Sequence, residues 1–140
     1  MGDIIDFCAY HASKSPRILI VENDADVRDI AESALTDAGH RVLVAEGGMA
    51  AFRLLERHPE IALMFVDIMM PRINGLMLAD MARMRRPEIR VLYTTGYGDA
   101  VSRQPGYRYG RVLPKPYRPR QLVAAVEHAL RSPPEGRRPA

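Results

Sequence analysis

Cysteine and tryptophan are almost absent from this chain of 140 residues, which has one cysteine, Cys8, and no tryptophan. A single cysteine cannot form a disulfide within the chain and fits a reducing compartment. Long apolar runs are also missing, because charged residues interrupt every stretch before the roughly 18 apolar residues that a membrane-spanning helix needs. The N-terminus lacks the basic start and apolar stretch of a secretory signal. We therefore expect a cytoplasmic location and no contact with a membrane.

A strong excess of one charge is missing as well. The formal net charge is +3, and residues 131–140 account for most of it through three arginines and one glutamate. A basic end of this kind is typical of a solvated tail and does not make a recognition surface for nucleic acid. The sequence also lacks zinc-ligand spacing, a Gly-rich phosphate loop and internal repeats. We therefore expect no direct binding to nucleic acid.

The sequence does contain a regular alternation of apolar runs and helical patterns. Runs rich in Val, Ile and Leu that do not alternate with polar residues predict strands buried on both faces, and they occupy residues 17–21, 41–45, 61–66, 90–94 and 111–113. Apolar residues at helical spacing predict helices between the strands, at residues 27–38, 51–57, 76–85 and 121–131. The connection 96–110, with Pro105 and four glycines, predicts only a short or distorted helix.

This alternation predicts an α/β fold in which an open parallel sheet is covered by helices on both faces. The expected domain covers residues 16–131, with a flexible arm at 1–15 and a basic flexible tail at 132–140. Ligands of such sheets bind beyond the carboxyl ends of the strands. The residues that follow the predicted strands are therefore the candidates for a functional site.

Polar residues follow four of the five predicted strands in a way that suggests one cluster. Glu22 and Asn23 follow the first strand, Asp67 the third, Thr95 the fourth and Lys115 the fifth. Carboxylate and amide oxygens suit Mg²⁺, with Mn²⁺ as the alternative. Lysine suits a phosphate or a carboxylate, and a threonine hydroxyl can donate to a phosphoryl oxygen. The cluster therefore predicts an aspartate that accepts a phosphoryl group.

Each of these residues also has a purely structural interpretation. Asp67 alone suits the cap of a turn, Lys115 an ordinary surface lysine, and Thr95 simple β-propensity. Asp24 is predicted to be the N-cap of the first helix, and Thr94 to be structural because it points away from Thr95. The methionines of the central segments are predicted to pack in the core, at positions 64, 69, 70, 77, 81 and 84.

With these residues in place, the sequence resembles the receiver domain of bacterial two-component response regulators over about residues 16–131. The segments that show the resemblance are LIVENDADVR, FVDIMMPRINGL, VLYTTGY and VLPKPY, in the order and at roughly the spacings of that family. The resemblance implies a flavodoxin-like, doubly wound sheet of five parallel strands in the order 2-1-3-4-5, with helices on both faces.

The resemblance also implies roles for the candidate residues. Asp67 would accept a phosphoryl group from a histidine kinase or a histidine phosphotransfer protein, Lys115 would pair with the phosphate, and Thr95 would be the switch hydroxyl. The peptide bond before Pro116 would be cis, which is cheap only before proline. The ligands of the required Mg²⁺ would be Glu22, Asn23, Asp67 and the backbone carbonyl of Met69.

The sequence departs from the family pattern in three places. Asn23 stands where a second acid is usual, so the metal site loses one negative charge. Val112 stands where an aromatic residue often moves with the switch hydroxyl, and Tyr107 or Tyr109 nearby are the candidates to replace it. The Pro-broken connection 96–110 falls where signal-dependent contacts or dimerisation often occur in this family.

Three functions follow, and one leads. The leading hypothesis is a phosphorelay switch that is not an enzyme and that acts on an unknown downstream protein; a homodimer stays open, as does membership of a larger protein. A degenerate receiver that binds partners without phosphorylation is the second, favoured by Asn23 and Val112. An aspartyl-nucleophile phosphatase is the third, but such enzymes usually need an acid where this chain has Met69.

Overall fold

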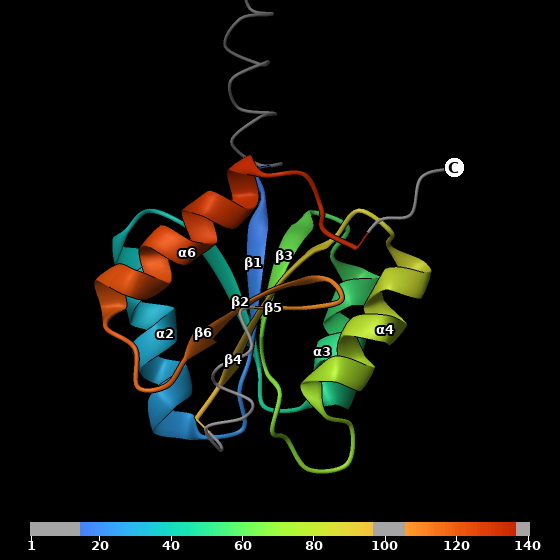
Figure 1. The fold of residues 1–140 in the computed structure, drawn as a ribbon, viewed down its shortest axis with the longest axis horizontal. Helices are drawn as coiled ribbons and strands as arrows, with labels where there is room; N and C mark the ends of the chain where they lie inside the picture. Colours follow the sequence, from blue (N-terminus) through green and yellow to red (C-terminus); the bar gives the residue numbers. More distant parts are fainter. Residues whose placement is uncertain (1–14, 97–105, 137–140) are drawn as a thin grey trace, which may run out of the picture.

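A computed structural model describes residues 15–96 and 106–136, which form one sheet flanked by helices (Figure 1). The elements are β1 (Arg17–Val21), α2 (Ala25–Asp37), β2 (Arg41–Ala45), α3 (Gly48–Arg57), β3 (Ile61–Asp67), α4 (Gly75–Arg85), β4 (Arg90–Thr95), β5 (Gly106–Tyr107), β6 (Gly110–Pro114) and α6 (Pro119–Arg131). Each predicted strand and each of the four predicted helices has a counterpart in this list.

The sheet has the predicted topology, with one addition. Its five main strands are parallel and lie in the order β2-β1-β3-β4-β6, which confirms the order 2-1-3-4-5. The sequence did not predict β5, a two-residue strand that pairs antiparallel with β6. The short helix predicted within residues 96–110 falls largely on residues 97–105, outside the described residues.

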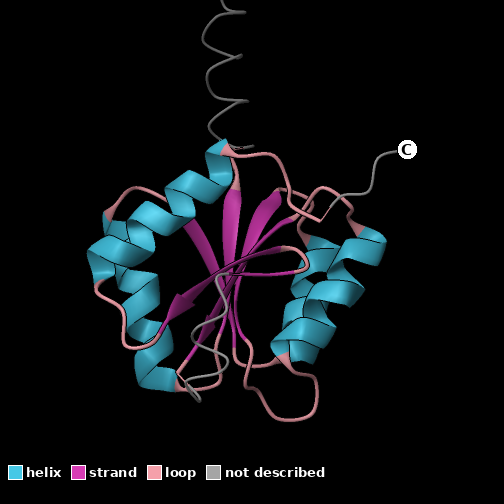
Figure 2. Cartoon of the chain, viewed as in Figure 1, coloured by secondary structure: helices cyan, strands magenta, loops and turns pink. Residues whose placement is uncertain are grey.

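Helices cover both faces of the sheet (Figures 1 and 2). One side, here called the α2–α6 face, packs the two helices against a cluster that includes Ile20, Phe65 and Leu122. The other side, the α3–α4 face, packs against a cluster that includes Val66 and Tyr93. Side chains alternate between the faces along each strand, so Phe65 and Val66 belong to different clusters. Because the five main strands are parallel, their carboxyl ends lie together at one edge of the sheet, here called the rim. The helix layers on the two faces do not cover this rim.

The loops that leave this rim are held by helix caps. Asp24 is the N-cap of α2, as predicted, because its side chain accepts hydrogen bonds from the backbone N–H groups of Asp26 (2.9 Å) and Val27 (3.2 Å). Asn74 caps α4 in the same way through the N–H of Met77 (2.9 Å). Both caps fix the chain shortly after a strand that ends at the rim.

The opposite end of β3 is held by one arginine. The Arg86 guanidinium donates to the backbone carbonyls of Leu55 (3.2 Å), His58 (3.1 Å) and Pro59 (2.7 Å), and also to that of Ile61. These acceptors span the end of α3, the loop after it and the first residue of β3. Arg86 therefore ties the amino end of β3 to the α3–α4 face.

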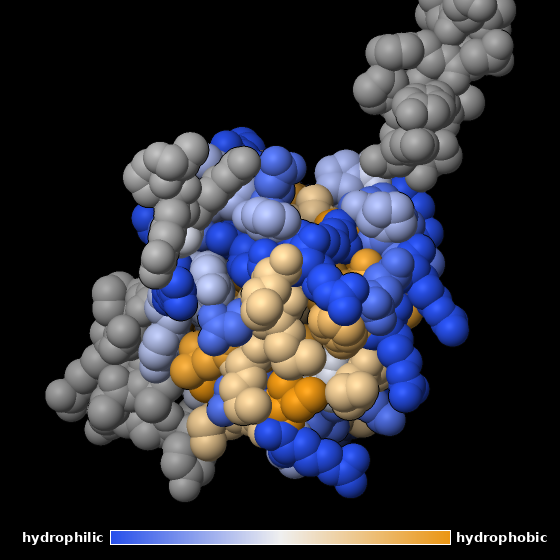
Figure 3. Space-filling model, turned by 90° about the vertical axis from the view of Figure 1, so that its right-hand side faces the viewer, coloured by the Kyte–Doolittle hydropathy of each residue, from blue (hydrophilic) through white to orange (hydrophobic). Residues whose placement is uncertain are grey.

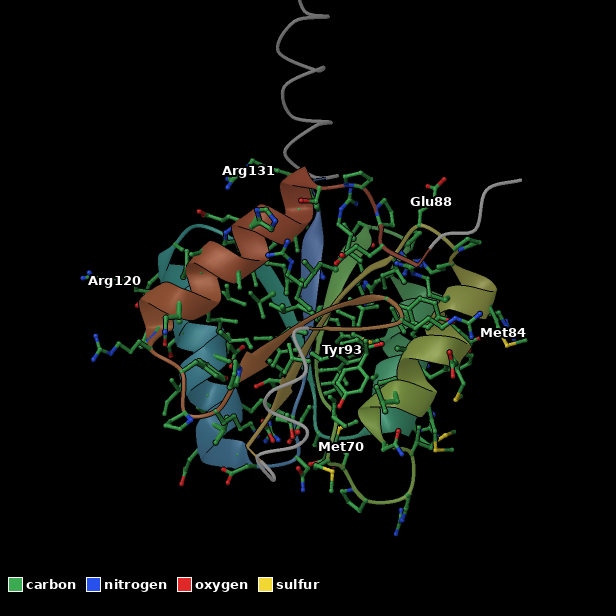
Figure 4. All side chains as sticks on the ribbon, viewed as in Figure 1. Met70, Met84, Glu88, Tyr93, Arg120 and Arg131 are labelled. Carbon is green, nitrogen blue, oxygen red and sulfur yellow. The ribbon has the colours of Figure 1, made fainter. Side chains whose placement is uncertain are left out.

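The prediction that all the central methionines pack in the core is wrong in part. Met64 and Met70 are buried, but Met69, Met77 and Met84 are 48%, 48% and 84% exposed. Figure 3 shows apolar side chains gathered on the side of the molecule that carries α3 and α4, and Figure 4 shows Met84 at the outer side of α4. α4 carries apolar residues on its outer side as well as its inner side, so the sequence pattern did not separate its exposed methionines from its buried residues. Met69 lies in the loop before α4 and outside any helix.

The ends of the described chain make specific contacts. The Arg41 guanidinium donates to the carbonyl of Ser15 (2.9 Å), and the Nε atom of Arg90 donates to the carbonyl of Ser132 (2.8 Å). Residues 1–14 and 137–140 lie outside the described residues. The boundaries of the N-terminal arm and the basic tail therefore stay predictions. Among residues 15–96 and 106–136, no helix has the length and apolar character to cross a membrane.

Candidate functional site

Asp67 ends the central strand of the sheet and is held on both sides of its carboxylate. Its β3 strand lies between β1 and β4, and the residue is 4% exposed. Oδ1 accepts the backbone N–H of Met69 (3.0 Å), and Oδ2 accepts a hydrogen bond from the Lys115 ammonium (3.0 Å). A buried carboxylate is tolerable only with such partners. Asp67 is therefore fixed in one orientation at the rim.

Glu22 follows the neighbouring strand β1 and is buried to a similar degree, with 3% of its surface exposed. Its Oε1 atom lies 2.6 Å from Nζ of Lys115, and its Oε2 atom accepts the N–H of Asp24 (3.1 Å). The Arg28 side chain donates to the Glu22 carbonyl (2.9 Å), which holds the backbone as well. The side chain thus points from the end of β1 to the same ammonium that contacts Asp67.

Lys115 joins the two acids. It follows β6, its N–H donates to the carbonyl of Thr95 (2.9 Å), and the Lys115–Pro116 peptide is cis, as the resemblance implies. The structure therefore brings Glu22, Asp67 and Lys115, three of the predicted site residues, into one ion-paired cluster.

Burial and charge act in opposite directions on this cluster. Burial raises the pKa of Glu22, and this outweighs the lowering by the hydrogen bonds from Lys115 and the Asp24 N–H. Burial lowers the pKa of Lys115, but the hydrogen bonds and charges of Glu22 and Asp67 outweigh it, so that pKa is raised. The lysine therefore stays charged at neutral pH. Two acidic side chains around a single ammonium make the rim attractive to a further cation.

The other predicted site residues lie around this cluster. Thr95 is fully buried at the end of β4, one residue beyond Thr94, which pairs with Asp67 in the sheet. The Thr94 hydroxyl donates to the carbonyl of Leu113 (2.7 Å), which fits its predicted structural role. Asn23 is exposed beside Glu22. The backbone of Met69 contacts Asp67 through its N–H group.

Aromatic rings near β6 come from the hairpin and not from position 112. Val112 is partly buried and packs against the core of the α3–α4 face, together with Tyr107 and Tyr109. The Tyr107 ring lies edge-on to Tyr93, with centroids 5.6 Å apart, and the Arg83 guanidinium lies 4.7 Å from the Tyr109 centroid. Figure 4 shows Tyr93 between the sheet and α4. The hairpin β5–β6 thus supplies rings to the region where the family usually has one on the strand.

The donor set at the rim fits a hard divalent cation. Within the described part of the chain, no group of three or more His, Cys, Asp and Glu side chains could hold a metal ion alone. Glu22 and Asp67 supply two carboxylates, and Asn23, which is exposed, follows Glu22 directly in the chain. Mg²⁺ binds proteins through few carboxylates and keeps several waters, so a site of this composition suits it.

Sequence reasoning missed two residues that shape this site. Arg28, on α2, holds the backbone of Glu22. Tyr117, in the segment VLPKPY, packs its ring edge-on against Phe65 with centroids 5.7 Å apart. An aromatic residue after a proline gives no signal that separates packing from function, so only its position in the fold draws attention to it.

Comparison with known proteins agrees with this arrangement. The family model described as "Response regulator receiver domain" matches residues 18–127, which is most of the chain. The chain belongs to this family. Receiver domains are signalling domains of two-component phosphorelays that interact with histidine kinases and generally depend on Mg²⁺, and this receiver is of that class.

Its relatives include short and long proteins. The response regulator receiver protein CpdR of Brucella abortus (strain 2308) is 35% identical over 117 residues, which cover 81% of this chain and 96% of the relative. Two longer curated relatives are described as transcriptional regulators, and this chain spans 46% and 49% of their lengths. Length alone therefore does not assign an output to the receiver.

Solved structures share its fold. A response regulator receiver protein from Sinorhizobium medicae WSM419 is 28% identical with a TM-score of 0.75, and the match covers 84% of this chain and 96% of that one. The receiver domain of the hybrid histidine kinase CckA is 31% identical with a TM-score of 0.71, over 82% and 99% of the two chains.

Proposed function

We propose that this receiver is an Mg²⁺-dependent phosphoacceptor in which Asp67 takes a phosphoryl group from a histidine kinase or a histidine phosphotransfer protein. The observation that supports this most directly is the Lys115 ammonium, 2.6 Å from Glu22 and 3.0 Å from Asp67. It places a positive charge at the carboxylate that would receive the phosphoryl group, where charge neutralisation and positioning supply most of the catalysis.

The transfer needs an in-line approach of the donor to Asp67. One carboxylate oxygen of Asp67 forms the new bond to phosphorus while the bond from phosphorus to the donor's imidazole nitrogen breaks, and the imidazole leaves. Lys115 pairs with the phosphoryl oxygens, and the Thr95 hydroxyl donates to one of them. The ion, held by Glu22, Asn23, Asp67 and the Met69 carbonyl, would neutralise phosphoryl charge when it is bound.

Incubation with Mg²⁺ and acetyl phosphate tests this function. We expect the protein to gain the mass of one phosphoryl group, acetate to be released, and Asp67→Asn to abolish the gain while the circular dichroism spectrum stays the same. A protein that forms no adduct would instead be a degenerate receiver, which the neutral Asn23 favours. Continuous release of inorganic phosphate from a phosphate ester would indicate a phosphatase.

Asn23→Asp should tighten Mg²⁺ binding, because it adds a negative charge at an exposed position beside Glu22. We expect the dissociation constant to fall about fivefold to tenfold, which corresponds to roughly 1 kcal/mol. Isothermal titration calorimetry with Mg²⁺ measures the dissociation constants of both proteins. Equal affinities would show that the missing charge does not limit metal binding.

The finer assignments belong to the same proposal. We propose that the receiver works in the cytoplasm and passes its signal to a downstream protein, with a homodimer as an open alternative. The outer side of α3 and α4, which exposes Met49, Met77 and Met84, is a candidate surface for such contacts.

A further inference from the structure

Tyr117 occupies a position beside the acidic site that the phosphoacceptor chemistry leaves unexplained. It lies two residues after Lys115, and its ring packs edge-on against Phe65, which lies two residues before Asp67. It is a partly buried member of the cluster on the α2–α6 face. Phe65 and Asp67 share one side of β3 because side chains alternate along a strand. The Tyr117 ring is therefore held on the side of the sheet from which Asp67 reaches the rim.

The Tyr117 hydroxyl is buried without a partner. Its oxygen is inaccessible to solvent and has no hydrogen bond to any residue in the described part of the chain. Burial, with a further contribution from the charges of Glu22 and Asp67, raises the pKa of Tyr117 to about 12. The hydroxyl therefore remains protonated at neutral pH and can donate a hydrogen bond. The charges of Glu22 and Asp67 act on it. A buried donor without an acceptor is rare and calls for an explanation.

The complementary need arises at Glu22 when the site is phosphorylated. In the resting site, the Oε1 atom of Glu22 has the Lys115 ammonium 2.6 Å away and no further hydrogen bond among the described residues. A phosphoryl group on Asp67 is a stronger attraction for Lys115 than a single carboxylate. If Lys115 turns to it, the Oε1 atom loses this ammonium as its hydrogen-bond donor, in a position that is 3% exposed. A buried carboxylate that loses a donor is stabilised by a replacement donor, also when it holds the ion of the proposed site.

We propose that Tyr117 is a positioning residue whose hydroxyl donates a hydrogen bond to the Glu22 carboxylate once Lys115 has moved to a phosphoryl group on Asp67. This inference depends on the phosphoacceptor function proposed above. It explains why a donor is kept unpaired in the resting site, since its acceptor is then held by the lysine. Carboxylates that hold a metal ion are commonly oriented by such a hydrogen bond.

The substitution Tyr117→Phe removes only the hydroxyl and separates the two states. Without ligands, we expect the variant to melt at or above the temperature of the wild type, because an unpaired buried hydroxyl is lost. With Mg²⁺ and beryllium fluoride, which imitates a phosphoryl group on an aspartate, we expect the affinity for beryllium fluoride to fall about tenfold, as for a lost hydrogen bond to a charged group. Thermal denaturation measures the melting temperatures, and titration with beryllium fluoride in the presence of Mg²⁺ measures the affinities.

Tyr93→Phe is the matched control. Tyr93 packs in the cluster of the α3–α4 face, whereas Tyr117 packs in the cluster of the α2–α6 face. Removal of the Tyr93 hydroxyl should change the melting temperature equally with and without beryllium fluoride, and should leave the affinity for beryllium fluoride unchanged. The comparison separates a lost tyrosine hydroxyl in general from the loss of this one.

A spectroscopic readout makes the test independent of affinity. With ¹³Cζ-labelled tyrosine, the resonance that Tyr117→Phe removes should shift when Mg²⁺ and beryllium fluoride are added. Three results would each overturn the inference: an equal affinity for beryllium fluoride in wild type and Tyr117→Phe, a resonance that does not shift, or a clearly lower melting temperature of the unliganded variant. If the wild type binds no beryllium fluoride and forms no adduct, the phosphoacceptor function itself is wrong, and the inference is overturned with it.

Discussion

Replacing Lys115 by methionine should destabilise the unliganded receiver by about 3 kcal/mol at neutral pH, the lower end of the range for breaking a buried ion pair. The variant keeps most of the apolar part of the side chain but leaves Glu22 and Asp67, both almost fully buried, without a cation between them. The lower end applies because the Lys115 side chain is 21% exposed. Urea denaturation in the presence of a chelator gives the free energy of unfolding of both proteins.

The loss should depend on pH and on Mg²⁺. The pKa of Glu22 is already raised in the folded protein, and removal of Lys115 raises it further. A carboxyl with a raised folded pKa takes up a proton on folding, so the variant should recover stability as the pH falls from 7 towards 5. Mg²⁺ should restore part of the loss and bind more tightly than to wild type, because the competing ammonium is absent. A variant as stable as wild type at pH 7 would contradict this view of the cluster.

Arg85→Met is the control for the loss of an arginine or lysine from an ion pair. Arg85 lies 3.4 Å from Glu56, but the two side chains are 65% and 48% exposed. An exposed pair of this kind contributes less than about 1 kcal/mol. Its removal should change the free energy of unfolding little at any pH between 5 and 7.

Gly75→Ala should destabilise the receiver by about 2 to 3 kcal/mol, although alanine is intrinsically the better helix former. A Cβ atom at this position, the first residue of α4, would lie 2.8 Å from the Cα atom of Ile68 and closer still to the carbonyl oxygen of Asp67. Both neighbours are backbone, so relief requires movement of the segment that follows the phosphoacceptor. We therefore also expect a lower yield of the acetyl phosphate adduct, measured by mass spectrometry.

Gly47→Ala provides the comparison, because a Cβ atom at Gly47 would have no neighbour within 4 Å. Gly47 is the N-cap of α3, where alanine is less favourable than glycine, so a loss of at most about 1 kcal/mol is expected. If the two variants lose the same stability, then close approach of the backbone at Gly75 is not the cause.

The fold was largely predictable because the strands of a buried parallel sheet are recognisable as short runs of Val, Ile and Leu. The run at residues 41–45 became β2 without change, and Asp24 caps α2 as its residue type and position suggested. Helix starts were less accurate: α2 begins at Ala25, two residues before the apolar pattern at Val27, since the first turn of a helix has no periodic apolar requirement. The β5–β6 hairpin escaped prediction because a two-residue strand is too short to show a pattern.

The site was predictable only in outline. Topology rules placed Glu22, Asp67 and Lys115 at one rim, but they did not indicate that a single ammonium contacts both carboxylates. That contact depends on the directions of the three side chains, which the sequence pattern does not record. The unpaired hydroxyl of Tyr117 depends on packing against Phe65, which no local pattern records.

The Arg86 side chain holds the amino end of β3 by contacts that differ in kind from those at the carboxyl end. Its hydrogen bonds go to main-chain carbonyls, which no phosphoryl group or metal ion at the far rim competes for. At the carboxyl end the equivalent fastening is an ion pair that a new dianion can rearrange. The strand that bears Asp67 is thus held at its amino end by contacts that phosphorylation leaves intact and at its carboxyl end by a contact that a phosphoryl group can replace, so displacement upon phosphorylation should remain confined to the carboxyl end and the loops beside it.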